Sequence, residues 1–302
     1  MTNISRRQFV SIAAAGAASV PAAFWSTPAF ARAPITAQEI VDRIKQKAGG
    51  EWKPDTVDTF KAGDPATAVT GVVTTTMATL DILKQAVKAG ANFVITTEPT
   101  FFAKSDAATP AAPRGGTAVP DAIYTAKNDF IRSNRLVIWR FSDHWRQRTP
   151  DPLATALADT LGWSKYRSAN DPTRLTIPAV TLDALASDLK KKLNTRGGIR
   201  VVGDRQNKVE KIGLLPGTTA IQAALSMIPS VDAIIAGEVR EWETVELVRD
   251  KGTAGEKKSL ILLGRVVSEN PGMDLCAKWI KEIIPEVKTT WLPVGDPYWR
   301  PA

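Results

Sequence analysis

The sequence predicts an α/β fold of two lobes, each with a mixed, largely parallel sheet flanked by helices. β-rich runs and helical patterns alternate along most of the 302-residue chain, and such alternation is typical of parallel sheets covered by helices on both faces. A break around residues 166–173, which contains an Asn-Asp-Pro turn signal, separates two halves of similar patterning. We therefore expect a first lobe over residues 34–168 and a second lobe over residues 174–302.

The first lobe is expected to begin with a helix. Thr36 and Glu39 have the spacing of a capping box ahead of apolar residues at helical spacing, and Gly49 and Gly50 end that pattern. Residues 103–118 are rich in Ala, Pro, Thr and Gly, which predicts an exposed loop. The other patterns predict strands over residues 69–75, 92–96 and 136–141, and helices over residues 78–88, 120–133 and 152–161.

The second lobe continues the alternation of helical and extended patterns. Helices and strands differ in the period at which apolar residues recur, and that period distinguishes the segments here. Helices are expected over residues 182–193, 218–227, 241–250 and 273–283, and extended segments over residues 199–202, 209–215, 232–235 and 259–263.

Residues 1–31 have the parts of a secretory leader in the right order. Arg6 and Arg7 precede an alanine-rich apolar stretch that ends in an Ala-Phe-Ala cleavage signal. Paired arginines in this context are typical of the twin-arginine pathway. The alternatives are an ordinary helix or a membrane anchor, but the run is short for a bilayer span and contains Gly and Pro. We expect residues 32–302 to be a folded cargo of the twin-arginine export machinery, delivered to the periplasm.

The chain is basic, with a formal net charge of +8 that falls to +6 without the leader, because the leader carries Arg6 and Arg7 and no acid. A basic balance is compatible with a nucleic acid or an anionic surface as partner. The lysines are scattered and not interleaved with aromatic residues, which favours a solvated surface and argues against nucleic-acid binding. The single Cys276 excludes an intramolecular disulfide. No second apolar run approaches membrane length, so no stable membrane anchor is expected.

Several catalytic classes are excluded because their residues are missing. With one His and one Cys, the chain has neither a His-Glu-x-x-His metalloprotease helix nor a Cys-x-x-Cys zinc site. It also lacks a phosphate loop, a Gly-x-Gly-x-x-Gly turn and a Gly-x-Ser-x-Gly elbow. Ser187 and Lys190 match the first element of a serine acyl-enzyme signature, but its companion motifs are absent.

Polar clusters follow four predicted strands, and they come from both halves of the chain. Ligands of parallel α/β sheets gather beyond the carboxyl ends of the strands. One strand-end carboxylate is more often a helix cap or a solvated loop residue, but four clusters together favour one cleft shared by two lobes. The clusters are residues 97–99, 142–145, 237–243 and 264–269.

Five stretches, residues 73–79, 97–102, 137–141, 237–246 and 268–273, carry a resemblance to a known family. The chain resembles the Nif-three-like family of dinuclear-metal-centre hexameric proteins, and most closely an exported branch of it. The resemblance implies a two-lobed α/β protomer, a homo-oligomer in the form of a hexamer, and a pair of metal ions between the lobes. Metal-dependent hydrolysis, including nucleotide-ring opening, is inferred for some members of the family.

The chain departs from this family at its histidines. Thr97 stands where the family begins its first block with His, and Arg265 stands where the late block reads Gly-His. Where the exported branch reads His-Asp-His-Trp-His, this chain has Ser142 at the first position and Arg146 at the last. Only His144 is left of the expected imidazoles. The carboxylates remain, and the candidate remnant metal site comprises Glu98, Asp143, His144, Asp151 and Glu269.

The loss of imidazole changes which ion the site could hold. Imidazole nitrogen supplies much of the affinity for zinc, iron and nickel, so a carboxylate-rich remnant would suit Mn²⁺ or Mg²⁺ better than Zn²⁺. An arginine about 4 Å from a divalent ion would repel it by several kcal/mol, whereas next to an unmetallated glutamate it would be attractive. Our hypothesis is that Arg265, with Arg146, replaces the cations and holds the cleft together by ion pairs.

Two functions remain open from the sequence. The first is an exported Nif-three-like protein with a histidine-depleted, degenerate metal site, acting as a ligand-binding or structural oligomer. The alternative is a divalent-metal-dependent hydrolase in which Glu98, His144 and Glu269 hold one hard ion. Glu238 or Glu241 would then be the general base for a metal-bound water.

Overall fold

The computed structural model describes residues 34–110, 112, 117, 119, 121–299 and 301, of which residues 35–299 and 301 belong to one compact unit. The predicted leader over residues 1–31 lies outside this described part. None of the described helices is long and apolar enough to cross a membrane.

The first sheet has five strands in the order β1-β4-β3-β2-β10. The neighbours β4, β3, β2 and β10 are parallel, and β1 pairs with β4 in antiparallel fashion. Every residue of β2, β3 and β4 is buried, as expected for parallel strands covered on both faces. The bounds are β1 Phe60–Ala62, β2 Val72–Thr75, β3 Phe93–Thr96, β4 Val137–Arg140 and β10 Thr289–Trp291.

The second sheet also has five strands, in the order β5-β7-β8-β9-β6. Its centre, β7, β8 and β9, is parallel, and the two outer strands are antiparallel to their neighbours. The predicted mixed α/β class is therefore confirmed. The bounds are β5 Arg174–Thr181, β6 Arg200–Val202, β7 Lys208–Thr218, β8 Ala233–Glu238 and β9 Ser259–Leu262.

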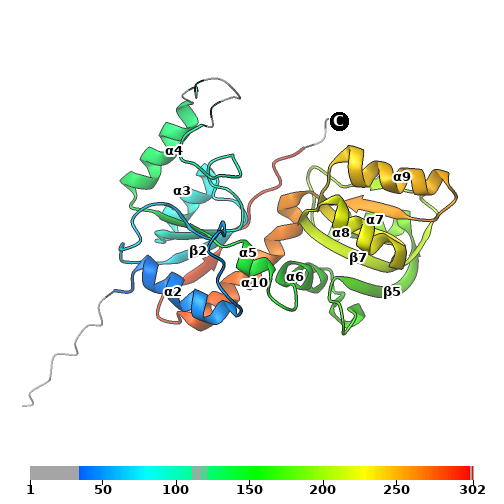
Figure 1. Cartoon of the computed structure of the whole chain (residues 1–302), viewed down its shortest axis with the longest axis horizontal. Helices are drawn as coiled ribbons and strands as arrows, with labels where there is room; N and C mark the ends of the chain where they lie inside the picture. Colours follow the sequence, from blue (N-terminus) through cyan, green and yellow to red (C-terminus); the bar gives the residue numbers. More distant parts are fainter. Residues whose placement is uncertain are drawn as a thin grey trace, which may run out of the picture. The chain divides into compact units, whose positions relative to one another are not determined.

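Helices cover both faces of each sheet (Figure 1). Buried residues of α2 and α10 pack on one face of the first sheet, and those of α3 and α4 on the other. In the second sheet, α6 and α7 cover one face and α8 and α9 the other. The bounds are α2 Ala37–Ala48, α3 Leu80–Lys88, α4 Ala122–Ser133, α5 Asp143–Arg146, α6 Pro152–Thr160, α7 Leu182–Lys192, α8 Ile221–Met227, α9 Glu246–Thr253 and α10 Arg265–Ile283, with one-turn helices η1 Ser164–Tyr166, η2 Ile228–Ser230 and η3 Glu241–Val245.

The long helix α10 connects the two sheets. It contacts β2 and β10 of the first sheet and β7 and β8 of the second. It begins directly after Gly264, at a φ of 88° that favours glycine. The helix therefore starts eight residues before the predicted residue 273, and the polar cluster at 264–269 lies in its first turns instead of a loop. Pro271 inside the helix, which cannot donate a backbone hydrogen bond, explains why the pattern indicated a later start.

Two segments pack with the other sheet from the one that the expected lobe boundaries imply. Helix α6, within the expected first lobe, packs its apolar face against the second sheet. Strand β10, within the expected second lobe, pairs with β2 in register Thr290 to Val73. Strands β1, β5 and β10 and the short helix α5 were not expected. Elements of three or four residues give too short a pattern to recognise, and the edge strand β5 has only two buried residues among its eight.

Candidate functional site

Two buried glutamates lie where the two sheets meet α10. Glu98 follows β3 and is 2% exposed, and Glu269 lies in the first turns of α10 and is fully buried. The backbone N–H of Glu98 donates to the carbonyl oxygen of Thr76, which fixes the turn after β3. Two buried carboxylates need positively charged partners, since an unpaired buried charge is strongly destabilising.

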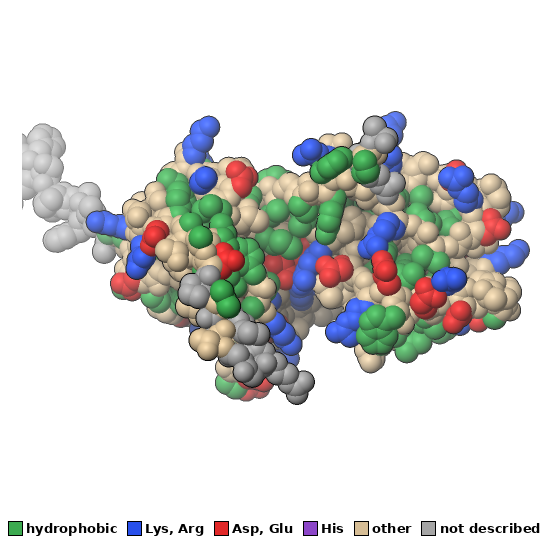
Figure 2. All heavy atoms as spheres, turned by 90° about the horizontal axis from the view of Figure 1, so that it is seen from above, with side chains coloured by type: hydrophobic (Ala, Val, Ile, Leu, Met, Phe, Trp, Pro, Cys, Tyr) green, Lys and Arg blue, Asp and Glu red, His purple; other side chains and the backbone are tan. Residues whose placement is uncertain are grey.

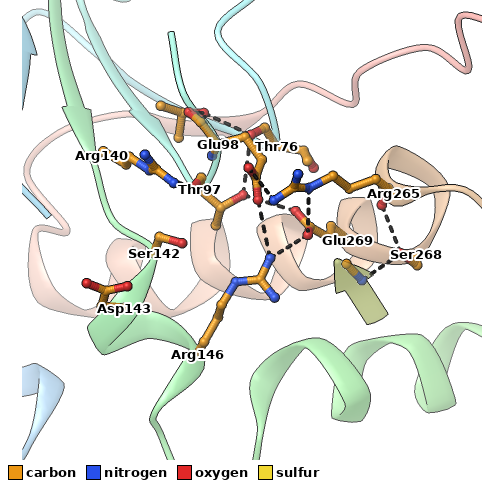
Figure 3. Close-up of polar contacts among 12 residues, drawn as sticks. Thr76, Thr97, Glu98, Arg140, Ser142, Asp143, Arg146, Arg265, Ser268 and Glu269 are labelled. Atoms are coloured by element: carbon orange, nitrogen blue, oxygen red, sulfur yellow. Dashed lines mark hydrogen bonds and ion pairs between the residues drawn. The ribbon is translucent and has the colours of Figure 1, made fainter. Parts of the chain in front are cut away.

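Two arginines supply these charges, and each reaches both glutamates (Figure 3). Nη2 of Arg265 lies 2.6 Å from Oε2 of Glu98, and its Nε lies 3.6 Å from Oε1 of Glu269. Nη2 of Arg146 donates to Oε1 of Glu269 and, at 3.4 Å, to Oε1 of Glu98. Arg146 comes from α5 and Arg265 from the start of α10. We call Glu98, Glu269, Arg146 and Arg265 the guanidinium–carboxylate cluster.

Burial and the proximity of the charged groups shift the pKa values of Glu98 and Arg146. Burial and the neighbouring Glu269 raise the pKa of Glu98 to about 7, although Arg265 and Arg146 act in the opposite direction. Burial alone would lower the pKa of Arg146, but the carboxylates of Glu269 and Glu98 raise it above its ordinary value. Arg146 therefore stays charged at every physiological pH, and Glu98 titrates near neutrality.

The hydroxyl of Thr97 and a third arginine lie next to the cluster. Thr97 Oγ1 donates at 3.4 Å to Oε2 of Glu269 and at 3.3 Å to the carbonyl oxygen of Thr76. Nε of Arg140 donates to the carbonyl oxygen of Thr97 at 3.1 Å. Thr97 therefore occupies the position between the carboxylate of Glu269 and the end of the first sheet.

Gly217, Gly237 and Ser268 allow the second sheet to approach the cluster; the sequence patterns included Gly237 and Ser268 in two of the polar clusters but did not single out Gly217. Ser268 Oγ accepts from the backbone N–H of Gly217 at 3.0 Å and donates to the carbonyl oxygen of Arg265 at 2.8 Å. A Cβ at Gly217 would clash with Glu269 Oε1, and one at Gly237 would clash with Ser268. Glycines at two neighbouring strand ends are the one sequence signal that could have indicated this close approach.

His144 and Asp143 lie outside the cluster, on the other side of α5. Nε2 of His144 accepts from the backbone N–H of Lys53 at 3.1 Å, so Nδ1 carries the proton and donates to Asp58 at 2.8 Å. Trp52 stacks on the imidazole, with ring centres 3.6 Å apart. Asp143 accepts from the loop over residues 56–57, and Figure 3 shows it turned away from the cluster. Both ring nitrogens of His144 are therefore already engaged.

The three other predicted carboxylates form no ion pair or hydrogen bond with the side chains of the cluster, although the charge of Asp151 acts on Arg146. Asp151 caps α6 by accepting from the N–H groups of residues 153 and 154. Glu241 is exposed and pairs with Arg200 at 2.8 Å. Glu238 ends β8 at the rim of a groove. Of the ten residues predicted for the site, the structure brings together five: Thr97, Glu98, Arg146, Arg265 and Glu269.

The donor set of this cluster does not fit a metal centre. Among the described residues, no three side chains of His, Cys, Asp or Glu are arranged to hold a metal ion. The oxygens of Glu98 and Glu269 that a cation would bind lie against Arg146 and Arg265, which would repel it. His144, the remaining imidazole, points to Asp58 and Lys53.

A groove of about 750 Å³ opens beside Arg265, at the carboxyl ends of β8 and β9. Its walls include Arg200, Glu238 and the aromatic residues Tyr298 and Trp299 of the C-terminal segment. On the face drawn in Figure 2, basic, acidic and hydrophobic side chains lie next to one another around a recess near the middle of the molecule. A groove of this size at parallel strand ends is where an α/β fold binds small ligands.

Known proteins share this architecture. Residues 149–294 match the family model described as Duf34/NIF3, NGG1p interacting factor 3, and no curated protein matches the chain significantly. The chain is similar to the Staphylococcus aureus hypothetical protein SA1388, with a TM-score of 0.65, 16% identity and coverage of 89% of this chain and 100% of that one. It is similar to a Bacillus cereus protein related to NIF3, with a TM-score of 0.66, 13% identity and coverage of 88% and 99%.

A third similar structure is reduced HcgD from Methanocaldococcus jannaschii, with a TM-score of 0.57, 14% identity and coverage of 86% of this chain and 98% of that one. At these identities the likeness shows the fold. The family model thus matches somewhat less than half of the chain, and the solved structures share its fold. Export, the hexamer and the metal content of this chain stay predictions.

Proposed function

We propose, from its NIF3-type fold, that this chain is an exported ligand-binding or structural oligomer in which arginines replace the metal ions of a degenerate site. One observation carries the proposal: Arg146 and Arg265 each contact both Glu98 and Glu269. When both carboxylates are ionised, they balance the charge of the two guanidinium groups without a bound cation. Bidentate and bridging arginine contacts also hold two elements together, here α5 and α10.

The electrostatics oppose an additional cation in the cluster. A divalent ion about 4 Å from a guanidinium group is repelled by several kcal/mol at an effective dielectric constant near 20. The two arginines already take the carboxylate oxygens that such an ion would need. The cluster is therefore expected to stabilise the fold and to shape the wall of the neighbouring groove.

Elemental analysis of the mature protein tests the proposal. After dialysis against a chelator, we expect well under one equivalent of any transition metal per chain, and a melting temperature that chelator and added Mn²⁺ leave unchanged. Near-stoichiometric metal that survives the dialysis would contradict the proposal.

A pair of substitutions tests the position of the cluster more directly. Arg265→His with Thr97→His adds two imidazoles beside Glu98 and Glu269 and removes one opposing charge, so metal content should rise. The control is Arg132→His with Thr253→His, which adds two imidazoles on the separate helices α4 and α9. A metal content that does not rise, or rises equally in the control, would show that the cluster is not a former metal site.

Hydrolysis is the rival function, and it has a distinct signature. An esterase, phosphatase or cyclic-amide hydrolase activity that requires added Mn²⁺ or Mg²⁺ and is lost in Glu269→Ala would favour the enzyme. We expect no such metal-dependent activity. Because Glu269 is buried between two arginines, the Ala variant must first be shown to fold by its near-UV circular dichroism.

Export and oligomerisation each have their own test. The paired arginines of the predicted leader support export, and substitution of Arg6 and Arg7 by Lys should leave the protein in the cytoplasmic fraction. Light scattering of the purified chain should give a mass several times that of one protomer. A single-chain mass would remove the oligomer from the proposal without affecting the cluster.

A further inference from the structure

The groove beside the guanidinium–carboxylate cluster has a wall of exposed aromatic rings on a fixed backbone. Tyr298 and Trp299 line the groove, yet they are 69% and 71% exposed. Their segment is held in place because Asp296 accepts from the backbone N–H of Gly197 at 2.9 Å and from that of Tyr298 at 3.1 Å. Large aromatic residues that remain exposed on an ordered backbone mark a binding surface.

Further back, the same segment is fastened to α10. Asn270 donates from Nδ2 to the carbonyl oxygen of Val294 at 2.8 Å and accepts from the backbone N–H of Val294 at 3.3 Å. Val294 is buried against Ile82 and Val266. The aromatic wall is therefore positioned by both lobes before any ligand arrives.

Two opposite charges on the groove have open hydrogen-bonding positions. Nη1 of Arg265 makes no hydrogen bond with the described residues, while its Nη2 lies 2.6 Å from Glu98 and its Nε 3.6 Å from Glu269. The carboxylate of Glu238 likewise has no ion pair or hydrogen bond with the described residues, although the backbone of the preceding Gly237 accepts from Gly264 at 3.0 Å. The guanidinium group of Arg265 is directed toward Glu98 and Glu269, and it therefore forms no ion pair with Glu238.

We propose that this groove binds a small zwitterion with a flat apolar body, of which an aromatic α-amino acid is the simplest example. Its carboxylate would pair with Arg265, its ammonium group with Glu238, and its ring would stack on Tyr298 and Trp299. A dianion would be repelled by Glu238, and a simple organic cation by Arg265. The groove volume of about 750 Å³ is ample for such a molecule. This inference rests on the proposed ligand-binding function and names the class of ligand.

Calorimetric titration of the mature, full-length protein with L-tryptophan tests the inference. Two matched probes each lack one charge: tryptamine has no carboxylate, and indole-3-propionate has no ammonium group. We expect saturable binding of L-tryptophan and at least ten-fold weaker binding of both probes. Absence of saturable L-tryptophan binding, or equal binding of either probe, would overturn the proposal.

Substitutions assign the binding to the groove. Tyr298→Ala with Trp299→Ala should weaken L-tryptophan binding at least five-fold. Glu238→Gln should weaken binding of L-tryptophan and leave that of indole-3-propionate unchanged or stronger. Trp242→Ala is the matched control, because Trp242 is 72% exposed and does not line the groove. A loss in Trp242→Ala as large as in the groove variants would overturn the assignment.

The two proposals can fail separately. Metal content and melting temperature are measured on the same preparation as ligand binding. A metal-free protein that does not bind L-tryptophan contradicts only the ligand class, whereas a protein that retains stoichiometric metal contradicts the arginine-for-metal replacement.

Discussion

Gly217 is where the backbone of the second sheet comes closest to the guanidinium–carboxylate cluster. Its φ of 79° lies in the left-handed region that side chains rarely adopt. A Cβ there would also lie 2.9 Å from both Nη atoms of Arg146 and would clash with Glu269 Oε1. Two independent reasons, backbone conformation and space, therefore require glycine at this position.

Gly217→Ala should destabilise the protein by about 2 kcal/mol or more, because a left-handed conformation alone costs roughly 1–2 kcal/mol outside glycine. Chemical denaturation measures the change. Gly252→Ala is the control, since that residue is helical in α9 and a Cβ would meet nothing within 4 Å. The control should be as stable as the parent or slightly more stable. Equal stability of both variants would show that Arg146 and Glu269 do not pack on Gly217.

Glu98 gives the cluster a dependence on pH whose sign follows from its raised pKa. In the unfolded chain the carboxyl loses its proton near its ordinary pKa of 4.5, and in the folded chain its pKa is about 7. Between these values the folded state binds more protons than the unfolded state. The contribution of Glu98 to stability therefore falls as the pH rises from about 4.5 to about 7 and is constant outside that window.

The difference in unfolding free energy between Glu98→Gln and the parent should change across this window. Gln is neutral at every pH, so the variant should gain stability relative to the parent between pH 4.5 and pH 7.5, by at most about 3 kcal/mol. Denaturant titrations at several pH values measure it. Glu210→Gln, an exposed position, should track the parent throughout. A difference that is independent of pH would show that Glu98 ionises normally in the folded chain.

At the scale of single elements, helix α5 is held by one aspartate from a distant loop. Asp58 is 2% exposed and accepts from the backbone N–H groups of residues 142, 143 and 144 and from the ring of His144. Helix α5 has only four residues and carries Arg146 at its end. The position of Arg146 in the cluster therefore depends on Asp58.

Asp58→Ala should destabilise the protein by about 3 kcal/mol, because it leaves two buried N–H groups, one part-buried N–H group and an imidazole without an acceptor. Asp121→Ala is the control: Asp121 caps α4 through a single exposed bond to the N–H of Ile123, and its loss should cost about 1 kcal/mol. Thermal and denaturant unfolding give both values. If the two substitutions cost the same, the loop that contains Asp58 does not organise α5.

The elements that the sequence predicted well are those whose signals are local. The capping box of Thr36 and Glu39 forms as expected, with the Thr36 side chain accepting from the Glu39 N–H and the Glu39 carboxylate accepting from the Thr36 N–H. Residues 93–96 and 137–140 are strands within one or two residues of the expected bounds. Helix α10 was predicted too short, because Pro271 is tolerated there by packing against α6 and not by local preference.

For the molecule as a whole, β10 brings the C-terminal part of the described chain back to the first sheet. Strand β10 covers β2, which would otherwise be a sheet edge with every residue buried. Leu292 and Val294 continue the packing beyond the strand. The segment that follows Gly295 contributes to the groove instead.

Two truncations separate these roles. A chain that ends at Lys288 should lose its cooperative thermal transition, because β2 becomes an exposed apolar edge. A chain that ends at Gly295 should melt within about 4 °C of the full chain and should lose L-tryptophan binding. Circular dichroism during heating measures both. Cooperative melting of the shorter chain at the parent temperature would contradict a structural role for β10.

The sequence by itself determined the fold class, most of the helices and buried strands, and the residue types at the positions where the family that it resembles has histidine. These follow from hydrophobic period, caps and residue identity, which are properties of neighbouring residues. Only the tertiary structure decided that Arg146 and Arg265 converge on Glu98 and Glu269, while His144 turns to Asp58. Those contacts join residues from separate strand ends and helices, so they depend on how the elements pack, and no local pattern carries that information.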